Sequence, residues 1–304
     1  MIYHMVAHLL KIDYSNVSNP DAIGEMSMKI KILGSGGGEG FPAAFCSCEH
    51  CQTARKKGNK SLRTLSQTII NDDLLIDFPA DTAAHCLYHG VNLGQLQNVL
   101  ITHSHIDHFE PSLLAMRGGV FCHNMKYEDI FFYGPENLKQ VCDTRDITAD
   151  FRKHIHFVPL AEHMPITIGN YRVTALNALH APGLGSLNYV IEQGEKSILY
   201  LLDSGYPTAE TLVYLKNLNK VFDAVIMDGT MGTAAPCTYI YHMSYQENKM
   251  LKAELEQLDI ADEHTRFIVT HITHNHSEYH EKTVEIFADT GIEVAYDGYE
   301  LTLA

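Results

Sequence analysis

The feature that most constrains this chain is a run of four metal-ligand residue types in NVLITHSHIDHFEP, directly after an apolar, strand-like stretch. The four are His103, His105, Asp107 and His108. At a spacing of two, His103 and His105 point to the same side of an extended chain. Imidazoles and a carboxylate together suit Zn, Mn or Fe. The run therefore predicts two neighbouring divalent cations at the end of a strand, and argues against a polar loop with incidental histidines.

Three further ligand-type residues end later apolar runs. They are His180 in ALNALHAPG, Asp203 in SILYLLDSGY and His271 in RFIVTHITHNHS. Taken alone, a strand-end Asp caps a turn and a lone His is an ordinary hydrogen-bonded residue. Because the first run already predicts metal, we interpret all three as additional ligands.

Composition restricts the class of partner. The chain has 304 residues, 45% of them hydrophobic and 19% charged, which is enough for a large packed core. The formal net charge of −15 argues against a protein that coats long nucleic acid, since such proteins need clustered Lys and Arg. A small-molecule substrate is the expected partner.

Strand-like and helical segments follow the same plan in the two halves of the chain. Apolar, β-rich segments predict strands at 29–33, 65–70, 74–78, 98–102, 129–134, 171–179, 187–193, 197–203, 223–228, 266–272 and 292–303. Helices are predicted at 81–91, 111–121, 208–219 and 244–257, with Ser244 as an N-cap. Two sets of strands, each with its helices, predict an α/β fold in which two sheets pack face to face with helices outside.

The first 27 residues look separate from the domain expected over residues 28–304. They are interpreted as an N-terminal extension, either an arm at a homodimer interface or an artefact of the annotated start, since Met26 and Met28 both precede the first strand. The opening has no basic secretory n-region, and no segment reaches the roughly 20 apolar residues of a membrane helix. A cytoplasmic protein without membrane contact is expected.

These motifs resemble the metallo-β-lactamase superfamily. The resemblance runs from about Lys29 to the C-terminus and includes LGSGGGEGFPA, the H-x-H-x-D-H run, LLDSG, MDGT and THITH. It is strongest to the phosphodiesterase branch, typified by the phosphoribosyl 1,2-cyclic phosphate phosphodiesterase. The resemblance implies an αββα sandwich of two mixed sheets with a two-metal site at one edge.

The resemblance also implies a role for each site residue. It assigns His103, His105 and His180 to one metal, Asp107, His108 and His271 to the other, and Asp203 as the bridge. It places Asp77 of LLIDF beside the metal histidines as an outer partner. It makes His242 of YIYHMSYQENK a phosphate contact and the general acid, against the simpler interpretation of a histidine at a helix start.

Two glycine-containing stretches indicate a function less specifically than the metal-ligand motifs do. GSGGG (34–38) lacks the Lys-Ser/Thr of a P-loop, so we expect it to pack its backbone closely beside the metal loop. Arg117 in LLAMRGGVF falls where the family has an arginine next to an aromatic residue, but Gly118 and Gly119 follow it here. A family role and a structural ion pair both remain open for Arg117.

The expected activity is metal-dependent hydrolysis through a metal-bridging hydroxide. Two cations about 3.5 to 4 Å apart lower the pKa of a shared water and stabilise charge on the reacting oxygens. The substrate favoured by the resemblance is a small cyclic or nucleotide-like phosphodiester. Lactone or thioester hydrolysis on the same metals is an alternative, and so is an oxidative or carrier role like that of family members in pyrroloquinoline-quinone biosynthesis.

A second metal site is predicted from FCSCEHC, in which Cys46, Cys48 and Cys51 supply three of the four ligands that structural zinc needs. The resemblance supports His274, the second histidine of THITH, as the fourth. His276 is the nearest rival, whereas His50 would strain the loop in which it lies. The other cysteines are predicted to be buried small hydrophobes: Cys86, Cys122, Cys142 and Cys237.

Overall fold

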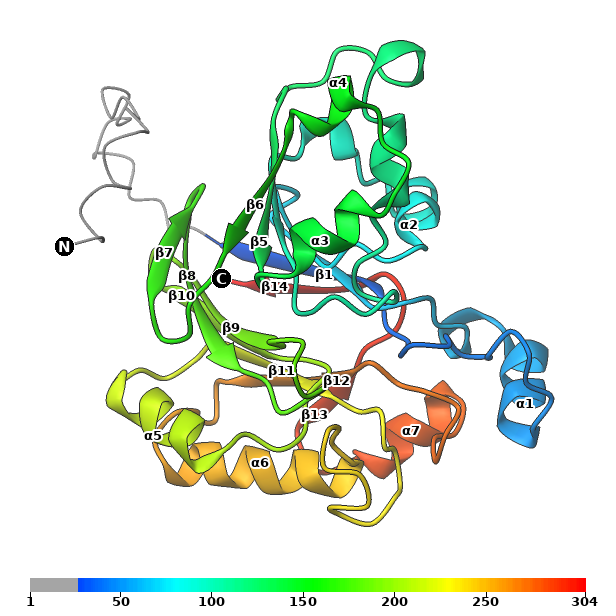
Figure 1. The fold of residues 1–304 in the computed structure, drawn as a ribbon. Helices are drawn as coiled ribbons and strands as arrows, with labels where there is room; N and C mark the ends of the chain where they lie inside the picture. The colour runs from blue at the N-terminus through cyan, green and yellow to red at the C-terminus, as the bar shows by residue number, and fades with distance from the viewer. Residues whose placement is uncertain (1–26) are drawn as a thin grey trace.

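The computed structural model describes residues 27–304, which form two seven-stranded sheets packed face to face between two outer layers of helices (Figure 1). This is the αββα sandwich that the sequence predicts. Apart from Ser27, the predicted N-terminal extension lies outside the described residues. Within them, no helix is long and apolar enough to cross a membrane.

The first sheet combines the N-terminal half of the chain with the last strand. Its order is β14 (Tyr299–Leu303), β1 (Met28–Gly34), β2 (Gln67–Ile70), β3 (Leu74–Ile76), β4 (Asn98–Leu100), β5 (Ile130–Gly134) and β6 (Ile155–Pro159). Strands β3 to β6 are parallel to one another, whereas β14, β1, β2 and β3 pair antiparallel. In Figure 1 the red β14 lies beside the blue β1.

The second sheet comes from the C-terminal half. Its order is β13 (Ile292–Val294), β12 (Arg266–Thr270), β11 (Ala224–Asp228), β10 (Lys196–Leu201), β9 (Leu187–Gln193), β8 (Tyr171–Asn177) and β7 (Pro165–Ile168). Here β10 to β13 are parallel and β7 to β10 antiparallel. Each sheet therefore joins an antiparallel meander to a parallel half.

Helices connect the parallel strands and cover the outer faces, except α1, which lies in the connection between the antiparallel strands β1 and β2. They are α1 (Glu49–Lys57), α2 (Thr82–His89), α3 (Leu138–Asp143), α4 (Ala149–Arg152), α5 (Ala209–Asn217), α6 (Tyr245–Gln257) and α7 (His280–Ile286). Short 3₁₀ turns add η1 (Asn59–Ser61), η2 (Leu93–Gln95), η3 (Pro111–Met116) and η4 (Gly119–Phe121). The Ser244 N-cap of α6 is confirmed, as part of a reciprocal capping box with Glu247.

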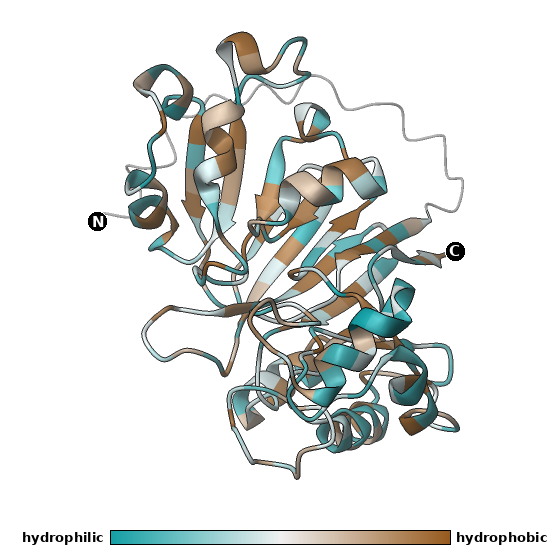
Figure 2. Cartoon of the chain, turned by 90° about the vertical axis from the view of Figure 1, so that its right-hand side faces the viewer, coloured by the Kyte–Doolittle hydropathy of each residue, from teal (hydrophilic) through white to brown (hydrophobic). Residues whose placement is uncertain are grey.

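The core has three apolar layers because the central strands are buried on both faces. In β10, Ile198 and Tyr200 pack between the sheets, while Leu199 and Leu201 pack against the helices α5 and α6. The sequences of such strands are continuous apolar runs. In Figure 2 these strands are mostly brown, the colour of hydrophobic residues. The carboxyl ends of the parallel strands meet at one edge of the sandwich, where ligands bind in folds of this kind.

Three local predictions were wrong in detail. The segment 111–121 is helical but divides into the two short 3₁₀ turns η3 and η4, because Gly118 between them is not in a helical conformation. The segment 292–303 divides between the sheets, as β13 in one and β14 in the other. Strands β6 and β7 were missed because each is a sheet edge, with partly exposed residues in place of an apolar run.

Candidate metal centre

The strand ends bring the predicted ligands into one buried cluster. His103 follows β4, His271 follows β12, and Asp203 lies just beyond β10. One group of possible donors holds His103, His105, His180 and Asp203, and a second holds Asp107, His108, Asp203 and His271. Within each group the donor atoms lie within 4.8 Å of one another. All seven predicted residues are therefore brought together, and Asp203 belongs to both groups.

Asp203 lies between the two groups. Its Oδ2 is 3.1 Å from His103 Nε2, 3.1 Å from His108 Nε2 and 3.4 Å from His180 Nε2. On the side of the first group, His105 Nδ1 lies 2.9 Å from His103 Nε2. On the side of the second, Asp107 Oδ2 lies 3.2 Å from His108 Nε2. A carboxylate in this place is suited to bridge two cations.

Outer partners fix the histidine rings. Asp77 Oδ2 accepts from His108 Nδ1 at 2.7 Å, and Asp77 Oδ1 accepts from the backbone N–H and hydroxyl of Thr102. His271 Nδ1 lies 2.7 Å from the Thr230 hydroxyl, whose proton goes to Asp228 Oδ2 at 2.9 Å. The far nitrogens of these rings therefore carry their protons, and their lone pairs point into the cluster. Asp77 occupies the outer position that the sequence predicts.

The donor set fits divalent cations. His108 Nε2 and His271 Nε2 lie 3.2 Å apart and face the same point, while their far nitrogens are held by Asp77 and Thr230. Asp203 Oδ1 is buried, with His242 Nδ1 at 3.0 Å and His271 Nε2 at 3.8 Å. Imidazole nitrogens and carboxylate oxygens gathered around one point are what metal binding requires.

The backbone is unusual at three of these positions. Asp77, Asp203 and His271 adopt φ values of 65°, 50° and 58°, a left-handed conformation that is uncommon for residues other than glycine. Each turn aims a strand-end side chain at the cluster. Such conformations concentrate at functional sites, where surrounding contacts hold them.

The glycine run packs against the metal loops, as predicted. A Cβ on Gly37 would lie 2.5 Å from Thr273 Cγ2 and 3.2 Å from His271 Cε1, and one on Gly38 would lie 3.3 Å from Asp107 Oδ2. Glycine therefore lets the backbone approach the half of the cluster that holds Asp107 and His271 this closely.

His242 borders the cluster and shares a carboxylate with His271. Its Nδ1 lies 3.2 Å from Asp228 Oδ2 and 3.0 Å from Asp203 Oδ1, and Asp228 Oδ2 lies 3.5 Å from His271 Nδ1. Burial lowers the pKa of His242, but the charges of Asp228 and Asp203 outweigh this and raise it to about 10. The ring is therefore protonated at neutral pH.

Asp228 was missed by the sequence reasoning. It ends β11, is fully buried, and accepts from the backbone N–H groups of Thr230 and Met243 as well as from His242. The signal was present, since AVIMD ends in an acidic residue as SILYLLD does. MDGT was noted as a matching stretch, but no role was assigned to its aspartate.

Arg117 lies away from the metal residues and makes no ion pair within the described part of the chain. It donates instead to the backbone carbonyls of Tyr127 and Glu128, at 2.8 and 2.5 Å. The structural ion pair considered for Arg117 is therefore wrong.

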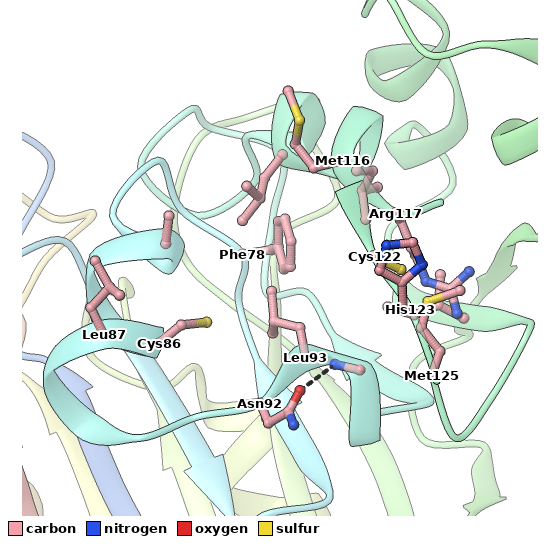
Figure 3. A pocket seen from close by; sticks show the side chains of 15 residues that line it. Phe78, Cys86, Leu87, Asn92, Leu93, Met116, Arg117, Cys122, His123 and Met125 are labelled. Atoms are coloured by element: carbon pink, nitrogen blue, oxygen red, sulfur yellow. Dashed lines mark hydrogen bonds between the residues drawn. The ribbon is translucent and has the colours of Figure 1, made fainter. Parts of the chain in front are cut away.

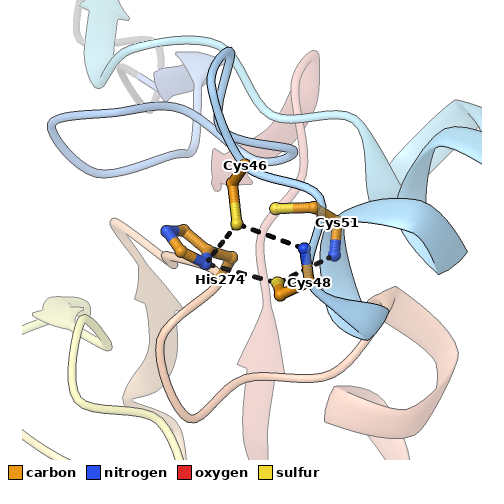
Figure 4. A group of neighbouring side chains, drawn as sticks. All are labelled: Cys46, Cys48, Cys51 and His274. Atoms are coloured by element: carbon orange, nitrogen blue, oxygen red, sulfur yellow. Dashed lines mark hydrogen bonds between the residues drawn. The ribbon is translucent and has the colours of Figure 1, made fainter.

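The three clustered cysteines meet His274, as Figure 4 shows. His274 Nδ1 lies 3.7 Å from Cys46 Sγ and 3.6 Å from Cys48 Sγ. Tetrahedral zinc with ordinary Zn–S and Zn–N distances places S and N about 3.6 Å apart. Cys48 caps α1 and accepts from the Cys51 N–H, so the helix start presents two of the thiols. The set fits a closed structural zinc.

Neighbouring contacts select His274 over its rivals. His274 Nε2 lies 3.2 Å from Glu39 Oε1, which orients the ring. His276 is exposed, and His50 Nδ1 lies 3.4 Å from Glu278 Oε2. Of the isolated cysteines, Cys142 is buried as predicted. Cys86 and Cys122 are half-buried and Cys237 is exposed, so that prediction was wrong for these three.

Comparison with known proteins shows where this architecture recurs. A family model described as beta-lactamase superfamily domain matches residues 75–296. Coenzyme PQQ synthesis protein B of Klebsiella pneumoniae (strain 342) is 25% identical over 330 residues, covering 91% of this chain and 98% of that protein.

Two solved structures share the fold. One is described as a new diphosphatase from the PhnP family, with 20% identity, a TM-score of 0.65, and coverage of 91% of this chain and 98% of that one. The other is Zn²⁺-bound PqqB from Methylobacterium extorquens, with 20% identity, a TM-score of 0.65, and coverage of 90% and 100%.

Proposed function

The chain belongs to the metallo-β-lactamase superfamily, and from this premise we propose that it is a two-metal phosphodiesterase for a small cyclic or nucleotide-like phosphodiester. The observation that carries the proposal is the position of Asp203. Its Oδ2 lies between two sets of metal-type donors, while its Oδ1 lies 3.0 Å from the ring nitrogen of His242. Two metal positions and a proton donor thus surround one point.

Divalent cations, Zn or Mn and alternatively Fe, would be held by His103, His105 and His180 on one side and by Asp107, His108 and His271 on the other, with Asp203 shared. When bound, they supply a nucleophilic water at neutral pH and neutralise charge on the phosphoryl oxygens. Asp77 and Thr230 keep the inward nitrogens of His108 and His271 free for this purpose.

His242 is the proposed phosphate contact and general acid. Asp228 holds its Nδ1, so Nε2 is the nitrogen free to face a substrate. The protonated ring would bind an anionic phosphodiester and give its proton to the leaving oxygen. The contact with an anionic phosphate is the part of this role that a neutral lactone or thioester would not use.

The test combines metal analysis with a screen of phosphodiesters. We expect hydrolysis of ribosyl cyclic phosphates, cyclic nucleotides or an aryl phosphodiester by protein loaded with Zn or Mn. The variant His242→Ala should keep its metal content and lose about 100-fold or more in kcat. The variant His264→Ala, which changes an exposed histidine, is the matched control. Normal turnover by His242→Ala would refute the general-acid role.

A second candidate function is a role in pyrroloquinoline-quinone synthesis. It is favoured by the matches to PQQ synthesis protein B, which extend over 91% of this chain. That function predicts redox-active iron and oxygen-dependent turnover in place of hydrolysis. Measuring oxygen consumption of iron-loaded protein beside the phosphodiester screen separates the two.

A further inference from the structure

An apolar cavity of about 450 Å³ lies between α2 and the segment that follows η3. Its wall includes Phe78, Leu93, Leu114 and Met125, and Figure 3 shows Phe78 near its centre, between Cys86 on one side and Arg117 and Cys122 on the other. Small-molecule sites occupy about 300–1,000 Å³ and are lined mainly by apolar side chains. None of the lining residues belongs to the donor groups of the metal centre, so this is a separate site.

Arg117 gives the cavity one fixed positive charge. Its two terminal nitrogens donate to the carbonyls of Tyr127 and Glu128, which hold the guanidinium at the wall. Within residues 27–304, no carboxylate lies within ion-pair distance of it. The charges of Asp129 and Glu128 act on Arg117 only from beyond that distance, so its half-buried charge is available to an anion from outside. No Lys and no second Arg line the cavity, and His123 is its one further basic side chain, so the complement is a monoanion.

The mouth of the cavity exposes large apolar side chains. Leu87 of α2 is 83% exposed and Met116 of η3 is 48% exposed, and both line the cavity. Apolar side chains grouped around a hollow mark a binding site for an apolar partner. The methionines Met116 and Met125 line the same wall, and their flexible side chains adapt to a chain-like ligand.

We propose that this cavity binds an aliphatic carboxylate, a free medium-chain fatty-acid anion. Its chain lies against Phe78 and Leu114, and its carboxylate meets Arg117. The planar guanidinium matches a carboxylate in geometry and charge. A phosphomonoester head group, with a charge of about −1.5 to −2 at pH 7, would carry more charge than one arginine neutralises.

The first test is calorimetric titration of the metal-loaded full-length protein with decanoate. We expect saturable binding of one decanoate per chain, weakened about 10-fold or more in Arg117→Leu. Arg172→Leu, which removes an exposed arginine of β8, is the control and should bind as the parent protein does. Equal affinity for decyltrimethylammonium, or unchanged affinity in Arg117→Leu, would overturn the proposal.

A second measurement needs no variant. Decanoate should slow alkylation of Cys86 and Cys122, which line the cavity, and leave the exposed Cys237 unaffected, as mapped by mass spectrometry. Equal rates with and without decanoate would contradict the assignment. A dimer that excludes decanoate and that Leu87→Asp dissociates, as detected by sedimentation, would also contradict the assignment. The occupant of the cavity would then be a second copy of the chain.

Discussion

At the residue scale, the buried carboxylates decide how the histidines are used. Asp77 and Asp228 are fully buried, and each accepts from a histidine at the metal cluster and from backbone N–H groups nearby. A carboxylate so placed fixes which nitrogen of the ring carries the proton. The orientation of His108 and His242 is thus determined by two carboxylates beyond the seven predicted ligands. Of the two, Asp228 also forms a group of possible metal donors with Asp203, His242 and His271.

Replacing Asp228 tests this arrangement. We expect Asp228→Asn to lower phosphodiesterase activity or metal affinity about 10- to 100-fold, because both His242 and the Thr230 hydroxyl that holds His271 lose the carboxylate that accepts from them. Asp223→Asn is the control, since Asp223 precedes the same strand at its opposite end and accepts from Ser197. Steady-state kinetics and metal titration measure both. Equal activities for the two variants would contradict the role of Asp228.

His85 makes stability depend on pH. The His85 side chain is 1% exposed. The amide nitrogen of Gln67 donates to Thr82, so the amide oxygen of Gln67 faces His85 Nδ1 at 2.6 Å. The neutral His85 ring therefore donates its Nδ1 proton to Gln67. Burial lowers its pKa to about 4. Because the folded pKa lies below the unfolded value of about 6.5, stability is complete above pH 6.5 and falls as the pH drops towards 4.

The expected difference can be measured by urea unfolding. Between pH 7.5 and 5 the parent protein should lose about 2 kcal/mol of unfolding free energy that His85→Gln does not lose, since only the parent has this group to protonate on unfolding. Parallel pH dependences for the two proteins would show that His85 is already charged in the folded state.

At the scale of elements, parallel strand ends and a glycine loop build the site together. The loop after β1 bonds to the loop after β12, with Ile272 donating to Ser35 and Gly37 donating to Ile272. Segments from opposite ends of the chain therefore share one edge. The parallel register explains why Asp203, Asp228 and His271 fall at neighbouring strand ends.

Gly37→Ala tests the close approach. Its new methyl group would meet Thr273 Cγ2 at 2.5 Å and His271 Cε1 at 3.2 Å, so His271 must shift. We expect metal affinity to fall about 10-fold. The double variant Gly37→Ala with Thr273→Ser removes the nearer methyl and should recover part of the loss, and Thr273→Ser alone is the control. No recovery in the double variant would assign the effect to another contact.

At the scale of the whole molecule, two long-range connections close the sandwich. β14 crosses from the C-terminal half to pair with β1 in the first sheet. The cysteine cluster joins Cys46 to His274 across 228 residues of sequence, beside the turn that carries His271. A metal that binds only the folded chain stabilises it by its binding free energy.

Removing His274 should therefore affect metal content and stability together. We expect His274→Ala to lose one zinc per chain and to melt at a lower temperature, whereas His276→Ala, two residues away and exposed, should change neither. Metal analysis and calorimetry give both readouts. Full zinc content in His274→Ala would mean that another residue completes the cysteine site.

The sequence alone was sufficient for features that depend on local spacing. Ligand types at the ends of apolar runs predicted the seven residues now seen together, because strand periodicity and the turn after a strand determine where such side chains point. Two sets of strands with helices likewise predicted the sandwich, since each apolar face must be covered.

Only the tertiary structure decided what depends on contacts between distant segments. It selected His274 over His276, placed Asp228 between His242 and His271, divided 292–303 between two sheets and opened a cavity beside Arg117. None of these four features follows from a periodicity or a residue spacing within one segment of the sequence. They arise when separate loops and strands pack against one another, so their partners become visible only once the sheets are assembled.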